Sequence, residues 1–264
     1  MEGRRLSRVE ARRADLRFPF PENFAARLTG ARIERMGRRA KYLAADLDTG
    51  DCLIMHLGMT GRFTIGGRQQ GKFHHDAGPP ERHEHVVFGL DDGGRIGYSD
   101  PRRFGFMDLW PLADIENYPA FRAMGPEPMS NRFSGAWLRE AFRGRRTPVK
   151  AALLDQSMVA GLGNIYVCEA LWRAGISPKR LAGSVSAPKA EALAAAVREV
   201  IAEAIEAGGS SISDFAATDG SLGYFQHRFS VYDREGEACG RCGGGVKRLV
   251  QSGRSTFYCG ACQR

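Results

Sequence analysis

The sequence lacks several features that define whole classes of protein. No apolar run is long enough to cross a bilayer, no stretch has the pattern of a secretory signal, and there are no internal repeats or low-complexity tracts. These absences argue against the membrane-spanning, repeat and disordered classes. The hydrophobic content of 43% is enough for packed cores, and 264 residues leave room for two domains plus a small module.

Cysteine is scarce, and its placement is informative. Four of the six cysteines form the pairs Cys239-x-x-Cys242 and Cys259-x-x-Cys262, with sixteen residues between the pairs. Two such turns offer four thiolates to one ion, which predicts a tetrahedral structural zinc site with no open position for catalysis. A pair of disulfides, or a zinc ribbon that only packs, remains the alternative.

The other two cysteines, Cys52 and Cys168, lie in apolar runs. We expect them to be buried thiols rather than bridge partners. Zinc thiolates together with free thiols favour a reducing compartment, and we therefore expect the cytoplasm.

Acidic residues are outnumbered by basic ones. The chain has 38 Lys and Arg against 30 Asp and Glu, a net charge of +8 and a pI of about 9.4. Residues 1–41 alone hold twelve basic and five acidic side chains. Further cations cluster at residues 143–150 and between the cysteine pairs, where Lys247, Arg248 and Arg254 lie. This distribution favours a polyanion such as nucleic acid as partner, although any single cluster can be an inert basic surface.

Hydrophobic periodicity divides the chain into a β part and a helical part. Up to about residue 113, short apolar runs alternate with turn signals, as expected of a β-sandwich or barrel. The predicted strands are residues 42–47, 52–57 and 63–65, and a hairpin of 85–90 with 95–98 around the turn Asp91–Gly94.

Four prolines between residues 111 and 128 indicate a linker, after which the period becomes helical. Helices are predicted at residues 134–143, 148–155, 164–174 and 187–207. The last is the strongest prediction, because an apolar stripe indicates a buried face; its residues are Leu193, Val197, Val200, Ile201, Ala204 and Ile205.

Four segments, taken in order, resemble the formamidopyrimidine-DNA glycosylases, bacterial enzymes that excise oxidised purines. They are Arg38-Arg-Ala-Lys-Tyr-Leu43, His56-Leu-Gly-Met-Thr-Gly61, Asp100-Pro-Arg-Arg-Phe-Gly105 and Gly161-Leu-Gly-Asn-Ile-Tyr166. Each motif alone is weak, but their order and the cysteine pairs behind them make the resemblance specific. The third segment favours this branch over the related endonuclease VIII branch.

The resemblance implies an α+β multidomain protein that binds damaged duplex DNA in a cleft between its domains. It implies an N-terminal β-sandwich at 1–113, a linker at 114–128, a helix–two-turn–helix domain at 129–229 and a zinc-finger hairpin at 230–264. We expect a monomer with no membrane partner. The DNA would contain an oxidised purine or an abasic site.

The resemblance also assigns roles to individual residues. Met59, Arg102 and Phe104 match the side chains that fill the space left by an everted nucleotide. Lys150 and Asn164 match phosphate-holding residues, and Asn164 is alternatively a helix N-cap. His83 and Arg145 match further DNA contacts.

Two residues match positions close to the chemistry: Lys41 near the reacting sugar, and Arg254, which grips phosphates and is implicated in elimination. The segment Thr218–Phe225 matches the loop over the extruded base. Its assigned residues are Thr218, Gly220, Gly223 and Tyr224, and the glycines provide mobility.

The family's chemistry begins with a proline directly after the initiator Met, followed by a glutamate. The proline amine attacks C1′ to form a Schiff base, which permits β- and δ-elimination. This chain begins Met1-Glu2-Gly3 and contains no such start, and Glu2 lies in the wrong register to replace the glutamate. We expect an enzyme whose start was assigned at an internal Met, and therefore a chain that is inactive as printed and less stable than a longer form. The alternatives are a catalytically silent DNA-binding protein and a zinc-ribbon protein that binds RNA or protein.

Overall fold

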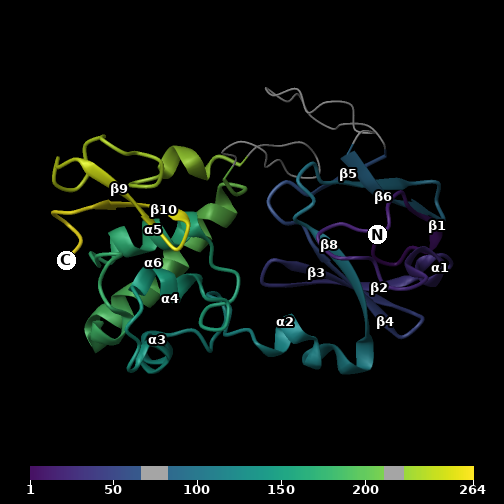
Figure 1. Ribbon diagram of the computed structural model, residues 1–264, viewed down its shortest axis with the longest axis horizontal. Helices are drawn as coiled ribbons and strands as arrows, with labels where there is room; N and C mark the ends of the chain where they lie inside the picture. Colours follow the sequence, from purple (N-terminus) through teal and green to yellow (C-terminus); the bar gives the residue numbers. More distant parts are fainter. Residues whose placement is uncertain (67–82, 211–222) are drawn as a thin grey trace. The chain divides into compact units, whose positions relative to one another are not determined.

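The protein is described by a computed structural model that covers residues 1–66, 83–210 and 223–264. The described chain divides into two compact units. The first comprises Met1–Arg122, and the second combines Ala123–Ser210 with Tyr224–Arg264. Figure 1 shows the elements of each unit.

The first unit is a sandwich of two four-stranded antiparallel sheets. One sheet has the order β1-β6-β7-β5, with strands Leu6–Ala11, Glu84–Leu90, Arg95–Ser99 and Arg62–Ile65. The other has the order β2-β3-β4-β8, with strands Ile33–Arg39, Tyr42–Leu47, Asp51–His56 and Phe106–Pro111. The predicted strands and the 85–98 hairpin are confirmed.

The core of this unit lies between the sheets. Phe88 and Tyr98 from one sheet pack with Leu53 and Met55 from the other, each at most 1% exposed. A short helix, α1 (Phe24–Leu28), covers one end and adds two apolar side chains to the core. The thiol of Cys52 is also buried and free, as predicted.

The first half of the predicted linker is structured. A 3-10 helix, η2 (Leu112–Asn117), and a short helix, α2 (Pro119–Arg122), follow β8 directly. Tyr118 is buried against Cys52 and Ile54 on the outer face of β4. The boundary between the two compact units falls after Arg122, within residues 114–128.

The second unit is built on helices. They are α3 (Gly135–Phe142), α4 (Val149–Leu154), α5 (Asn164–Arg173) and α6 (Ala187–Glu206), with 3-10 turns η3 (Ala182–Ser184) and η4 (Phe225–Arg228). All four predicted helices are confirmed. Ser134 caps α3, because its hydroxyl accepts a hydrogen bond from the amide of Trp137 at 3.1 Å.

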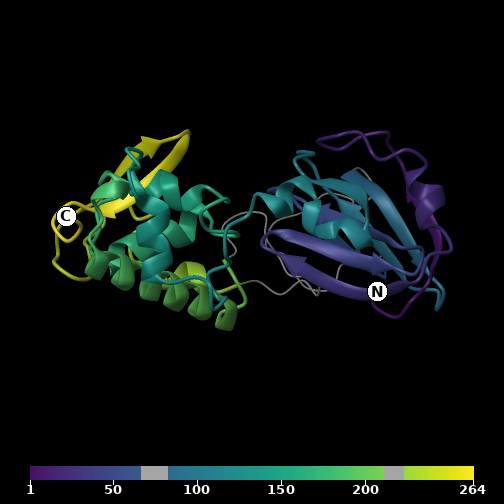
Figure 2. The same ribbon diagram turned by 90° about the horizontal axis from the view of Figure 1, so that it is seen from below.

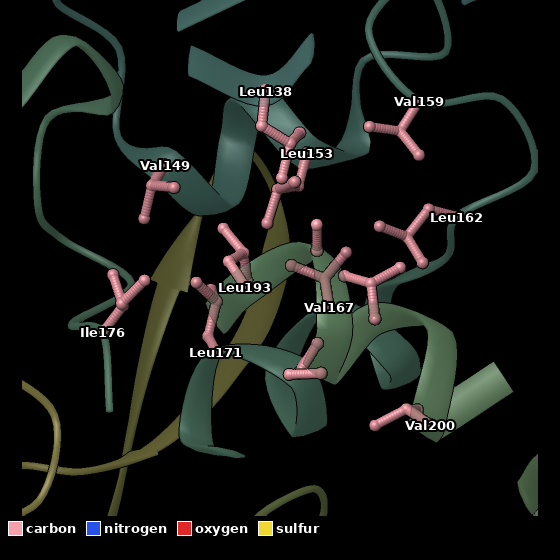
Figure 3. Packing of buried hydrophobic residues seen from close by; sticks show 14 of the residues in the cluster. Leu138, Val149, Leu153, Val159, Leu162, Val167, Leu171, Ile176, Leu193 and Val200 are labelled. Atoms are coloured by element: carbon pink, nitrogen blue, oxygen red, sulfur yellow. The ribbon is translucent and has the colours of Figure 1, made fainter. Parts of the chain in front are cut away.

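The helices enclose one apolar core. Figure 3 shows Leu138 and Leu153 pointing towards Leu193 and Val167, and all four are fully buried. The predicted stripe on α6 is wrong at one position. Ile205 is 68% exposed, whereas Ala204 in the same turn is 3% exposed, so Ile205 lies on the solvent side of α6.

The C-terminal segment forms the predicted hairpin, β9 (Val246–Gln251) with β10 (Arg254–Cys259). Ser252 and Gly253 both have positive φ, at 50° and 71°, as a tight two-residue turn requires. The hairpin packs against α5, which lies between it and α6 (Figure 2).

No helix in the described ranges is long and apolar enough to span a membrane.

The helical core gives the first testable prediction. Leu193→Ala should lower the free energy of unfolding by about 2–5 kcal/mol, because it leaves a cavity in a close-packed core. Thermal and urea unfolding of the variant would measure the loss. Ile205→Ala on the same helix is the matched control and should be nearly neutral. Equal losses from the two variants would contradict the buried face assigned to α6.

Candidate nucleic-acid interface and zinc site

Three exposed side chains from two loops meet on the first unit. Met59 is 71% exposed and Phe104 is 44% exposed, which is unusual for large apolar residues. The guanidinium of Arg102 lies over the Phe104 ring at 4.6 Å, and its Nη1 is 4.0 Å from the Met59 sulfur. The three residues, called here the wedge cluster, therefore form one apolar and cationic projection.

A buried carboxylate holds the two loops of the wedge cluster together. Asp100 is fully buried, and its side chain accepts hydrogen bonds from the Thr60 hydroxyl, from the Gly105 amide at 2.8 Å and from the Tyr98 hydroxyl at 3.3 Å. The Thr60 hydroxyl also accepts from the amide of Arg102 at 3.3 Å. Thr60 and Arg102 flank the same carboxylate, so Asp100 fixes both loops.

Close backbone contact also requires glycine in these loops. A Cβ on Gly58 would lie 2.6 Å from the amide nitrogen of Gly105. Gly58 has φ +66°, which L side chains rarely adopt. The Gly58 amide donates to His56 Nδ1 at 3.0 Å. The turn that carries Met59 is therefore held by this hydrogen bond and by its close contact with the backbone of Gly105.

Lys41 lies at the turn between β2 and β3, where Ala40 has φ 52°. Burial lowers the pKa of His56, and the charges of Lys41 and Arg17 lower it further. His56 is therefore a neutral acceptor at pH 7, consistent with its bond to the Gly58 amide.

His83 precedes β6, and its carbonyl accepts the Asp100 amide at 3.0 Å, which places it beside the wedge-cluster loops.

In the second unit, the hairpin that carries Arg254 rests on two polar side chains. Lys150 is fully buried on α4, and its Nζ donates to the Ser255 carbonyl at 3.0 Å and to Thr256 Oγ1 at 2.6 Å. Asn164 Nδ2 on α5 donates to the same carbonyl at 3.0 Å. Burial lowers the pKa of Lys150, and the charge of Arg254 also lowers it. Both side chains thus lie directly beneath the exposed Arg254.

Asn164 is not the N-cap of α5. Gly163 occupies that position, and Asn164 is the first helical residue. Its side chain is turned to the hairpin instead, and its buried Oδ1 has no hydrogen-bond partner among the described residues. The free amides of the first helical turn face the same end of the helix.

The remaining predicted residues have simpler surroundings. Arg145 donates to the Ala141 carbonyl at 3.0 Å and lies 3.8 Å from Asp155. Gly223 is buried, whereas Tyr224 is 65% exposed and its amide bonds the Ala207 carbonyl at 2.9 Å beyond the end of α6. Thr218 and Gly220 lie outside the described residues.

The four paired cysteines come together at the base of the hairpin. All four Sγ atoms of Cys239, Cys242, Cys259 and Cys262 lie within 4.8 Å of one another. Two cross-pair separations are 3.5 and 3.9 Å. A tetrahedral site with Zn–S bonds of about 2.3 Å requires sulfur atoms roughly 3.8 Å apart, so the donor set fits zinc. All six cysteines are free thiols, which argues against the alternative of two disulfides.

Comparison with known proteins agrees with this geometry. Residues 1–107 match the formamidopyrimidine-DNA glycosylase N-terminal domain, residues 124–216 match its H2TH domain, and residues 236–264 match a zinc finger found in FPG and IleRS. The formamidopyrimidine-DNA glycosylase of Ruegeria pomeroyi is 56% identical over 100% of this chain and 94% of its own length. The chain belongs to the formamidopyrimidine-DNA glycosylase family.

Solved structures of the family share the fold. The MutM (FPG) protein of Thermus thermophilus is 38% identical, with a TM-score of 0.85 over 100% of this chain and 92% of that one. A Lactococcus lactis FPG mutant in complex with Fapy-dG containing DNA is 32% identical, with a TM-score of 0.88 over 100% and 93%. The matched zinc finger and the four close thiols together give this family member one structural zinc ion, held by Cys239, Cys242, Cys259 and Cys262.

Sequence reasoning missed the residues that position the site. Asp100 and Thr60 lie inside the quoted family motifs but received no role. Glu169 on α5 was also missed: it is fully buried and accepts the amides of Ser230, Val231 and Tyr232 at 2.8–2.9 Å. An acidic residue inside an apolar helical run was the available signal, because a buried carboxylate needs hydrogen-bond donors.

Asp100→Asn should destabilise the wedge-cluster loops by about 1–3 kcal/mol. The amide keeps the volume but presents N–H groups to the donors that the carboxylate accepted. Hydrogen exchange at the Gly105 amide and the free energy of unfolding would measure the effect. Asp92→Asn, on an exposed carboxylate paired with Arg4, is the control and should change neither. Unchanged exchange at Gly105 in Asp100→Asn would show that the carboxylate does not hold the loops.

Removal of zinc should unfold the finger and leave the helical core folded, because four uncompensated thiolates cannot remain together. We expect the β9–β10 amides to lose hydrogen-exchange protection after chelation, while the ellipticity from α3 to α6 persists. Hairpin amides that stay protected after metal analysis shows that zinc is gone would refute this expectation.

Proposed function

We propose that this family member is a base-excision repair protein that acts on oxidised purines in duplex DNA. Its substrates would be 8-oxoguanine and formamidopyrimidines, which are excised before the abasic strand is nicked by β,δ-elimination. The observation that carries the proposal is the wedge cluster. An exposed methionine, arginine and phenylalanine held on two rigid loops suit insertion into a base stack, and none of the three belongs to a hydrophobic core cluster of the described unit.

The wedge cluster supplies two kinds of contact. Met59 and Phe104 are apolar surfaces on which unstacked bases can rest, at a cost of a few kcal/mol per unstacked step that binding must offset. Arg102 presents a planar guanidinium that can bond the cytosine left without a partner. Its position over the Phe104 ring already restricts its rotamers. His83, next to the same loops, would add a contact to the DNA backbone.

The second unit offers the phosphate contacts. A cation and a set of hydrogen-bond donors lie close together here. The cation is Arg254 at the hairpin tip, and the donors are the first-turn amides of α5 next to Asn164. Lys150 would add its positive charge from beneath the hairpin while holding the Ser255 carbonyl. Arg145, on the exposed turn after α3, would contact a further phosphate. The buried, unpartnered Oδ1 of Asn164 supports a change in its bonds when DNA binds.

The lesion itself would be covered by the segment that contains Thr218, Gly220, Gly223 and Tyr224. Only the last two residues lie in the described part of the chain. Tyr224 offers an exposed ring at that end, and its amide bonds the Ala207 carbonyl at 2.9 Å, which attaches Tyr224 to the helical unit.

Strand cleavage needs an amine nucleophile and an acid–base group. Lys41 would act near the sugar and Arg254 in the elimination, but the 264 residues include no Pro-Glu start. Glu2 does not substitute, since its carboxylate accepts the Met36 amide at 2.7 Å on β2. We therefore propose that strand cleavage requires the family's Pro-Glu start, to which none of the 264 residues corresponds.

Borohydride trapping on a duplex with one 8-oxoguanine opposite cytosine would test the chemistry. Borohydride reduces a Schiff base to a stable covalent adduct. We expect an adduct only with a version extended at its N-terminus to begin Met-Pro-Glu. An adduct with the printed chain would point to another amine, Lys41 first. Tight binding without an adduct from either version would replace the enzyme assignment by that of a silent DNA-binding protein.

Arg254→Ala tests the phosphate contact separately. It should weaken DNA binding on any sequence and reduce the slope of log K against log salt by about 1. Arg27→Ala is the matched control, because it removes the same charge from α1, where Arg27 pairs with Asp51 at 2.7 Å. Equal salt slopes for the two variants would remove Arg254 from the interface.

A further inference from the structure

An indole from the helical unit touches the zinc site. Trp172 lies in the last turn of α5, and its Nε1 donates to the sulfur of Cys239 at 3.4 Å. The ring is half-buried and packs against the small apolar cluster around Cys239 and Cys259. One of the four thiolates therefore accepts a hydrogen bond from a side chain outside the finger.

The first cysteine turn also contacts Trp172. Arg241, between Cys239 and Cys242, places its guanidinium 4.4 Å from the centroid of the Trp172 ring. It also donates to the carbonyls of Trp172 at 3.2 Å and Arg173 at 3.3 Å. These carbonyls lie at the C-terminal end of α5, where a cation is favoured by the helix dipole and by the lack of intrahelical partners.

The second cysteine turn meets the loop that follows α5. Gln263 is 3% exposed, accepts the amide of Cys259 at 2.8 Å and donates to the carbonyl of Ile176 at 3.0 Å. The amide of Arg264 bonds the carbonyl of Gly175 at 3.1 Å. Both cysteine turns are thus attached to one end of one helix.

A zinc ion with four thiolates carries a formal excess of two negative charges, so donors and cations at the sulfur atoms stabilise the loaded site. Partners outside the ligand shell of a metal commonly change its affinity by 10- to 100-fold. The indole N–H is a fixed donor, because the Arg241 contact and the α5 backbone orient the ring. A charged amine in its place would be solvated and mobile.

We propose that Trp172 is a positioning residue of the zinc site: its indole N–H bonds the Cys239 thiolate, raises zinc affinity and fixes the finger to the end of α5. The bond makes zinc loading and the order of the last turn of α5 mutually dependent. The opposite end of α5 begins at Asn164, which bonds the hairpin at Ser255, so the finger is attached to both ends of this helix.

Trp172→Phe removes the N–H but keeps an aromatic ring under Arg241. We expect the full chain carrying this change to bind zinc about 10-fold more weakly in competition with a chelator. With Co²⁺ in place of zinc, the sulfur-to-cobalt charge-transfer band should move to lower energy, because a thiolate without its hydrogen bond gives up electrons more easily.

Trp137→Phe is the matched control. Its indole N–H also makes one hydrogen bond within the second unit, but to the Met158 carbonyl at 3.0 Å rather than to a thiolate. It should leave zinc affinity and the cobalt band unchanged. If both variants match the parent chain in affinity and in the band position, the proposal is wrong.

A second measurement leaves Trp172 intact, so it does not depend on how Trp172→Phe folds. In the double variant Trp110→Phe/Trp137→Phe, Trp172 is the only remaining tryptophan of the three in the chain. Its fluorescence should change as zinc is removed and return when zinc is restored. Emission that is the same with and without zinc would overturn the proposed contact.

Discussion

The buried carboxylate of Asp100 is the constraint on which the exposed part of the first unit depends. A carboxylate with no solvent exposure needs donors around it, and here they come from two loops and from β7. The loops cannot move apart without leaving those donors and the charge unpaired. Rigid placement of Met59, Arg102 and Phe104 is the consequence, and a wedge must be rigid because binding gains nothing from side chains that still have to be ordered.

The second unit is also held by a buried charge, which in the case of Lys150 is positive. Lys150 is buried and paired with oxygen acceptors of β10, while Glu169 gathers three amides at the entrance to the finger. Removing one partner of such a buried charge costs more free energy than an exposed ion pair contributes, because the other partner remains buried and unpaired. Many surface arginines of this chain are in exposed pairs, for example Arg143 with Glu140. The number of exposed arginines determines the positive electrostatic field of the protein. The few buried charges determine the geometry of its loops and its hairpin.

The sequence predicts the elements well where burial repeats with a simple period. Strands 42–47 and 52–57 and the helix at 187–207 carry continuous or striped apolar residues, and all are present. It is weaker for β1, where the buried residues Leu6 and Val9 are three apart because the pairing with β6 shifts between Leu6 and Arg8. It is also weaker for β2, in which only Ile33 is fully buried among exposed or half-buried residues. The cysteine spacing predicted the zinc ligands because that chemistry is local. The partners of Asp100 and Trp172 were not predictable, since Thr60 is 40 residues from Asp100 and Cys239 is 67 residues from Trp172.

Helix α5 shows why such long-range contacts matter to the proposed function. Its first turn bonds the hairpin at Ser255, its last turn bonds the first cysteine turn, and the loop after it bonds the second. Arg173 also makes two 2.6 Å bonds to Glu203 on α6. A ten-residue helix is short, and its own hydrogen bonds would leave it marginal in isolation. Contacts at both ends therefore make its N-terminal amides and the Arg254 hairpin parts of one rigid body. In this arrangement the four thiolates and zinc close the finger, and the finger holds the helix whose first turn is proposed to meet the phosphate.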